Sequence, residues 1–165
     1  MKMVIAGAGA YAFAPALLDD LFVRTRTDCE LWLVEGDLDT AELTARAAQA
    51  VSRCMGLSTP IYYTSSLYQA LPGADFVIFC QDFIDAQRWM DDQKRLDDIG
   101  LGRQMRTMGG IGGAIHALKC ISLTMDAAER MQQVCPQATL VLTTGPMARM
   151  AEAAQRFACL LYTSA

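Results

Sequence analysis

The sequence is short of charge, and of positive charge above all, which excludes several classes of protein. Its 165 residues include 14 Lys and Arg against 18 Asp and Glu, so the net charge is −4. DNA-reading proteins and polybasic membrane-binding surfaces need a positive excess. We therefore expect neither nucleic acid nor a membrane as a partner. Charged residues make up only 19%, against roughly 25% in typical domains, which favours a surface covered by a further domain or subunit. We also expect the protein to be cytoplasmic and to form a homo-oligomer.

Metal ligands at structural spacing are also missing. The six cysteines include no Cys-x-x-Cys pair, and His116 is the single histidine. Structural zinc sites need closely spaced pairs of these residues. We predict reduced, buried cysteines that pack as small apolar side chains, and no metal site built from this chain alone.

No uninterrupted apolar run is long enough to span a membrane, which takes about 20 residues. Residues 3–18 follow Lys2 and are uncharged, as in a secretory signal. However, Gly7, Gly9 and Pro15 interrupt them and two aspartates follow. This pattern favours the start of a folded domain over a signal peptide.

What the sequence does contain is a regular alternation of short apolar segments with longer amphipathic ones, which is typical of βαβ units. The short segments are apolar throughout, which predicts strands buried on both faces of a parallel sheet. We therefore predict an α/β fold: a doubly wound, mostly parallel, Rossmann-like sheet in strand order 3-2-1-4-5, with helices on both faces. The predicted strands are residues 3–6, 31–35, 61–63, 76–80 and 139–143, and the predicted helices are residues 12–25, 38–55, 66–71, 86–99, 113–134 and 147–158.

The turn after the first predicted strand fits the dinucleotide-binding pattern G-x-G-x-x-G/A, from Gly7 to Ala12. In this pattern Gly7 permits a tight turn, Gly9 lets the backbone approach a pyrophosphate, and Ala12 lets helix and strand pack closely. Free backbone amides at the start of the following helix favour a diphosphate without any basic side chain.

An acidic residue ends the second predicted strand, where such folds bind the adenine ribose. Glu35 lies about 20 residues beyond the turn, which is the spacing of the ribose-binding acid. Its charge would repel a 2′-phosphate, so NAD is favoured over NADP. Asp37 is an alternative ribose ligand, although it is better placed to cap the next helix.

A second glycine-rich stretch, residues 100–113, predicts a long irregular loop, and such loops are often functional. It leads into the helix that contains His116. Flexible backbone at a helix start can bind an anionic or polyol ligand. His116 is either a contact of that ligand or an ordinary residue of the helix face.

Five segments in order, residues 7–17, 30–37, 74–78, 110–119 and 135–139, resemble the N-terminal half of glycoside hydrolase family 4. The resemblance covers nearly the whole chain. This family contains NAD- and manganese-dependent α-galactosidases, α-glucosidases and 6-phospho-glycosidases. On this resemblance residues 1–158 form the NAD-binding domain, without the catalytic C-terminal part. Residues 159–165 form a tail that looks like read-through of a cloning adapter, and we expect the fragment alone to be inactive.

The resemblance implies a redox route to the hydrolysis of O-glycosyl bonds, unlike that of paired-carboxylate glycosidases. NAD⁺ removes a hydride from C3 of the sugar, a divalent metal polarises the new carbonyl, and a tyrosine removes the C2 proton. The glycosidic oxygen is then expelled, water adds, and the hydride returns. The family's Cys and His ligands for Mn²⁺ would lie beyond this chain. The implied cofactor-binding residues are Gly7, Gly9, Ala10, Ala12, Phe13, Glu35 and Cys80.

The substrate-binding pattern departs from the family's. The Asn-x-x-Asn-Pro motif reads Leu-Thr-Thr-Gly-Pro here, with Gly145 in place of the second Asn, and Thr107 stands where the family has an acid. The implied substrate contacts are Gln81, Gly145 and His116, and no catalytic residue is assigned. Two alternatives stay open: a non-catalytic NAD-binding paralogue, and a lactate/malate-type 2-hydroxyacid dehydrogenase, which shares the first βαβ unit.

Overall fold

A computed structural model describes residues 1–80, 86–103, 110–158 and 162–164 of the chain. Its centre is one parallel sheet in the order β3-β2-β1-β4-β5-β6. The predicted parallel sheet and the order of its first five strands are thus confirmed. The sixth strand, which we did not predict, lies in the segment that we assigned to a tail. The strands are β1 (Lys2–Ala6), β2 (Glu30–Val34), β3 (Ile61–Thr64), β4 (Phe76–Phe79), β5 (Thr139–Leu142) and β6 (Tyr162–Ser164).

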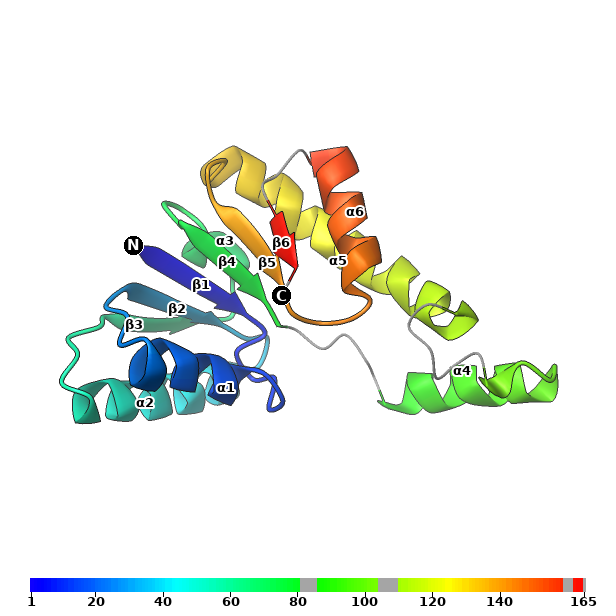
Figure 1. The fold of residues 1–165 in the computed structure, drawn as a ribbon, viewed down its shortest axis with the longest axis horizontal. Coiled ribbons are helices and arrows are strands. Elements are labelled where there is room, and N and C mark those ends of the chain that lie inside the picture. The colour runs from blue at the N-terminus through cyan, green and yellow to red at the C-terminus, as the bar shows by residue number, and fades with distance from the viewer. Residues whose placement is uncertain (81–85, 104–109, 159–161, 165) are drawn as a thin grey trace.

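Helices cover both faces of the sheet, as expected for a doubly wound fold (Figure 1). The first helices pack on one face, and α3, α5 and α6 pack on the other. The helix α4 lies to the side of the sheet, beside the amino-terminal half of α5 (Figure 1). The helices are α1 (Ala14–Asp19), the π-helix η1 (Asp20–Arg24), α2 (Leu38–Cys54), α3 (Leu67–Ala70), α4 (Ala86–Asp98), α5 (Ile111–Val134) and α6 (Met147–Ala158).

Alternate residues of each central strand supply two separate cores. In β1, Val4 and Ala6 pack with α5 and α6, whereas Met3 and Ile5 pack with α1, η1 and α2. All four are buried. This explains why the inner residues of β1 are apolar on both sides of the strand: both faces of the parallel sheet are covered there.

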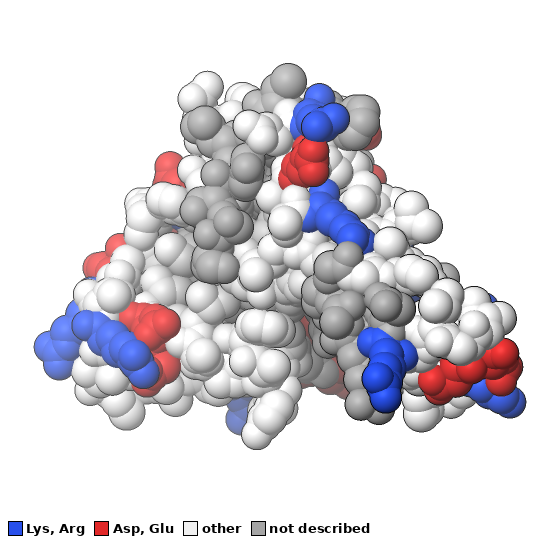
Figure 2. Space-filling view, turned by 45° about the vertical axis from the view of Figure 1, so that its right-hand side comes forward, with Lys and Arg blue, Asp and Glu red and all other residues white. Residues whose placement is uncertain are grey.

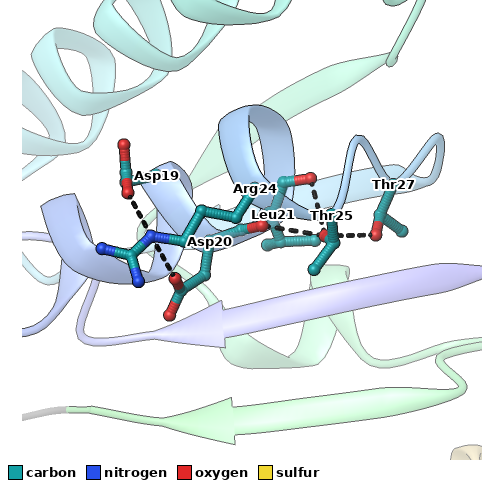
Figure 3. A network of polar contacts seen from close by, with 6 residues as sticks. All are labelled: Asp19, Asp20, Leu21, Arg24, Thr25 and Thr27. Atoms are coloured by element: carbon teal, nitrogen blue, oxygen red, sulfur yellow. Dashed lines mark hydrogen bonds and ion pairs between the residues drawn. The ribbon is translucent and has the colours of Figure 1, made fainter.

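The first helix differs from the predicted residues 12–25. Residues 11–13 form turns, α1 begins at Ala14, and the last turns widen into the π-helix η1. Side-chain contacts close this widened end (Figure 3). The Nε atom of Arg24 lies 2.9 Å from Asp19 and 3.1 Å from Asp20, and the Thr25 hydroxyl donates to the Asp20 carbonyl at 2.8 Å. These ion pairs are exposed, so they define the end of the helix more than they stabilise the fold.

The long helix α5 begins at Ile111, two residues earlier than predicted, with Gly110 as its N-cap. The glycine-rich stretch therefore ends in helix. Residues 104–109 of the predicted loop, including Thr107, are outside the described residues. In the described ranges, no helix is both long and apolar enough to cross a membrane.

Candidate functional site

The glycine turn after β1 is tied to the end of β2 by backbone hydrogen bonds. The amides of Gly7 and Ala8 both donate to the Val34 carbonyl, at 2.9 and 3.0 Å. Gly7 has a φ of 89°, which side chains rarely permit, so glycine is needed for this tight turn. The sequence-based role of Gly7 agrees with this geometry.

Two successive amides beyond the turn have no partner within the described part of the chain. The amides of Phe13 and Ala14 both donate to the Ala10 carbonyl, at 3.0 and 2.9 Å, whereas those of Tyr11 and Ala12 make no hydrogen bond there. Both residues are exposed, and the Tyr11 side chain is 92% exposed. Adjacent free amides at the entry to a helical segment are suited to bind an anion such as a phosphate.

The carboxylate of Glu35 lies next to this turn and is oriented by two amides. Its Oε2 accepts a hydrogen bond from Gly9 N at 2.9 Å, and its Oε1 accepts one from Gly36 N at 2.7 Å. Each carboxylate oxygen can accept a second bond. The half-buried Glu35 therefore keeps the capacity to bind a pair of sugar hydroxyls.

The alternative ribose ligand, Asp37, is occupied as the N-cap of α2. Its carboxylate accepts hydrogen bonds from both the amide and the hydroxyl of Thr40. The hydrogen bond from the Thr40 hydroxyl is the main reason why the pKa of Asp37 lies below its usual value. The structure therefore favours Glu35 as the ribose-binding acid.

Gly9 has a steric role that the sequence pattern did not reveal. A Cβ atom at Gly9 would lie 2.8 Å from Glu35 Oε2 and 2.7 Å from Thr40 Cγ2. Both separations are far below van der Waals contact. In this chain Gly9 makes room for Glu35, whereas the sequence pattern suggested only an approach of backbone to pyrophosphate.

One of the predicted cofactor-binding residues, Ala12, has different surroundings from those expected. Ala12 is exposed, so it does not mediate close packing of helix on strand, and Ala14, only 2% exposed, takes that role because the helix starts there. Phe13 and Ala10 are half-buried and pack against the core beneath α1 and α2. Their backbones form part of the turn, and their side chains hold it against the core by packing there.

Cys80 follows β4 and brings that strand beside the turn. Its amide donates to the Ala6 carbonyl at 2.8 Å, and its side chain is fully buried. Burial raises the pKa of the Cys80 thiol to about 11. Cys80 thus contributes its backbone to the sheet edge beside the turn, and its buried thiol is not a nucleophile.

We predict that iodoacetamide near neutral pH modifies Cys54 but not Cys80 in the folded chain. Cys54 is exposed, whereas the Cys80 thiol is both covered and neutral, and only a thiolate reacts quickly. Peptide mapping by mass spectrometry measures both sites, and unfolding in urea should equalise them. Equal labelling of the two in the folded chain would contradict the burial of Cys80.

A pocket that sequence analysis missed lies at the same edge of the sheet, between the segment after β3 and the middle of α5. Its volume is about 310 Å³. Glu35 lies next to this pocket, because its amide donates to the Thr64 carbonyl at 3.1 Å and Ser65, the next residue, lines the pocket. The pocket is large enough for one aromatic base. Only the fold brings these segments together, and no local motif marks them. The lining residues are Ser65, Ser66, Leu67, Phe79, Leu123, Asp126, Ala127 and Arg130.

The predicted substrate contacts are not gathered as expected. Gln81 is outside the described residues. Gly145 follows β5 in a cis bond to Pro146. His116 lies on α5, where its Nε2 is 3.3 Å from the Sγ atom of Cys120. Its ring also makes an edge contact with the Trp89 ring of α4. The described residues therefore link His116 to the α4–α5 side of the molecule and not to the glycine turn.

A larger cavity of about 470 Å³ lies between α1 and α2, and the glycine turn lines one part of it through Gly9 and Tyr11. Leu18, Val23, Leu43 and Val51 form much of its wall, and Asp19 is its only charged residue. A dinucleotide needs hydrogen-bond donors for its phosphates. The wall of this cavity is mainly apolar, and Glu35 is not among its lining residues.

Charge and metal ligands are both sparse in the described ranges. No three His, Cys, Asp or Glu side chains there lie close enough together to hold a metal ion. On the face shown in Figure 2, acidic and basic side chains lie near one another at several places around a largely uncharged surface. A dinucleotide would therefore be held here by backbone amides and one carboxylate, without a basic cluster.

Comparison with known families separates the glycosidase interpretation from the dehydrogenase alternative. Residues 2–161 match the family 4 glycosyl hydrolases. The chain belongs to this family. It is 27% identical over 157 residues to an α-glucosidase of Erwinia rhapontici, and 25% identical over 148 residues to an α-galacturonidase of Thermoanaerobacter italicus. These matches cover 94% and 90% of this chain but 35% and 32% of the relatives, so the chain spans about a third of their length.

Solved structures of family 4 enzymes share the fold. A 6-phospho-β-glucosidase of Thermotoga maritima, solved with manganese, NAD⁺ and glucose-6-phosphate, superposes with a TM-score of 0.76 at 21% identity, over 95% of this chain and 37% of that one. Malate dehydrogenase of Plasmodium falciparum superposes with a TM-score of 0.67 at 14% identity, over 100% of this chain and 44% of that one. The dehydrogenase alternative thus shares only the fold, whereas the family match assigns this chain to the glycosyl hydrolases.

Proposed function

We propose that this chain is the NAD-binding domain of a family 4 glycosidase. The observation that carries the proposal is the pair of amides at Tyr11 and Ala12, which have no partner among the described residues and lie near the Glu35 carboxylate. The amides would bind the diphosphate, and Glu35 would accept hydrogen bonds from the adenine ribose. The pocket lined by Leu123 and Ser65 would hold the adenine ring.

The nicotinamide end would then extend along the carboxyl edge towards the loop after β5. In folds of this type the dinucleotide crosses the sheet near the first and fourth strands, which here are joined by the hydrogen bond from Cys80 N to Ala6 O. Beyond them, Thr143 donates its hydroxyl to the Phe79 carbonyl at 3.1 Å and fixes the start of the β5 loop. Bound NAD⁺ supplies a hydride acceptor, and the chain's own residues hold and orient it.

We propose that the longer protein hydrolyses an O-glycosyl bond of a glycoside in the cytoplasm as a homo-oligomer. The family match supports the reaction class, and the relatives that it resembles act on different sugars. The described residues offer no group of three metal ligands, so no Mn²⁺ ligand is assigned among them. No step is assigned to the metal here.

NAD should bind the 165-residue chain at least about tenfold more tightly than NADP, because Glu35 repels a 2′-phosphate in a partly buried setting. Isothermal titration calorimetry with each cofactor measures the preference. Glu35→Gln should reduce the preference by removing the charge. Asp37→Asn, which alters the helix cap, should keep it. Absence of NAD binding at millimolar concentration would reject the proposed function.

A second candidate, a non-catalytic NAD-binding paralogue, is favoured by one feature. Gly145 has no side chain at the position where the family carries an amide. Expression of the longer protein separates the two candidates: manganese-dependent cleavage of a glycoside rejects the paralogue, and NAD binding without turnover supports it.

A further inference from the structure

The glycine turn depends on the end of β2 through three consecutive amides. Gly7 and Ala8 donate to the Val34 carbonyl, and Gly9 donates to the Glu35 side chain. The first two bonds use backbone acceptors that any residue would supply. The third depends on the identity of residue 35.

The carboxylate is itself fixed, so it can act as a support for the turn. Its other oxygen accepts from Gly36 N at 2.7 Å. Ala10 N donates to the Gly7 carbonyl at 3.0 Å, and the next two amides, of Tyr11 and Ala12, have no partner in the part of the chain that the structure describes. A displacement of Gly9 would therefore move the two amides that we assign to the diphosphate.

We propose that Glu35 is a positioning residue for the diphosphate site: it sets the glycine turn before any nucleotide binds, in addition to binding the ribose. This inference rests on the proposed function only for the identity of the ligand. The hydrogen bond from Gly9 N to Glu35 Oε2 joins two groups of the chain itself. It follows that Glu35 contributes to the binding of diphosphate compounds that have no ribose hydroxyls.

Simple electrostatics predicts the opposite sign, which makes the proposal testable. A carboxylate near a diphosphate repels it, so removal of the charge alone should strengthen the binding of a ligand without ribose hydroxyls. If Glu35 positions the turn, its replacement should weaken that binding in spite of the lost repulsion.

The test uses ADP and 2′,3′-dideoxy-ADP with the wild-type chain, Glu35→Gln and Glu35→Asp. Calorimetric titration should show that Glu35→Gln weakens both nucleotides by at least about threefold. Glu35→Asp keeps the charge but shortens the reach to Gly9, so it should weaken them too. The matched control is Glu30→Gln, the same change at the other end of β2, where Glu30 contacts Trp32 and Lys2. Unchanged or tighter binding of dideoxy-ADP to Glu35→Gln would overturn the proposal.

Amide hydrogen exchange on the ligand-free chain tests the same inference without a nucleotide. By NMR the Gly9 amide should be protected in the wild type and in Glu30→Gln, and should exchange about tenfold faster in Glu35→Gln. Circular dichroism verifies that each variant is folded. Equal Gly9 exchange in the wild type and Glu35→Gln would overturn the proposal. Failure of the wild type to bind ADP or NAD would reject the proposed function instead, and the exchange result would still stand.

Discussion

Gly9→Ala should weaken NAD binding by about tenfold to a hundredfold while leaving the chain folded. The added Cβ would meet Glu35 Oε2 at 2.8 Å and Thr40 Cγ2 at 2.7 Å. Glu35 can move away by rotating its flexible side chain, whereas Thr40 can yield only by rotating about χ1, which would also disturb its hydroxyl contact with Asp37. The variant would displace Glu35 from Gly9 and lose hydrogen bonds to a charged group, each worth about 1.5–3 kcal/mol. Isothermal titration calorimetry with NAD measures the loss.

Gly36→Ala is the matched control, because it places the same methyl group on the other side of Glu35. A Cβ at Gly36 would meet no atom within 4 Å. We therefore expect Gly36→Ala to bind NAD with nearly wild-type affinity. If the two variants bound NAD equally well, the steric coupling between Gly9 and Glu35 would be wrong.

Phe22→Ala should destabilise the chain by about 3–5 kcal/mol, as is typical of a large buried aromatic side chain. Phe22 is fully buried in η1 and packs in the core beneath α1 and α2. Since the free energy of unfolding of a domain is only about 5–15 kcal/mol, this one change would remove a large part of it. Urea unfolding followed by circular dichroism measures it.

The neighbouring residue gives the comparison. Val23 lies in the same π-helix but is 40% exposed, so Val23→Ala should cost less than about 1 kcal/mol. A loss of similar size in both variants would show that η1 does not pack on the sheet in the way described.

Sequence reasoning succeeded where one local signal was sufficient. The apolar segments near Val4, Leu33 and Val77 identified buried parallel strands, and the pattern from Gly7 to Ala12 with Glu35 located the turn and its acid. In each case the physical requirement, such as burial on both faces or a positive φ at Gly7, falls on residues close together in the chain.

It failed where the outcome depends on contacts between distant segments. The role of Ala12 passed to Ala14 because the helix starts two residues later than the motif suggests. The pocket between Ser65 and Leu123 exists only once β3 and α5 lie at the same edge of the sheet. The strand β6 was missed because its segment was interpreted as a tail, and its pairing with β5 is visible only in three dimensions.

The most direct test of the account is an NMR titration of the 165-residue chain with NAD, followed through its backbone amides. The largest shifts are expected at Tyr11 and Ala12, with smaller ones at Gly9 and Gly36, and almost none at Leu43 in the cavity between α1 and α2. Shifts concentrated at Leu43, with the amides of Tyr11 and Ala12 unmoved, would contradict it.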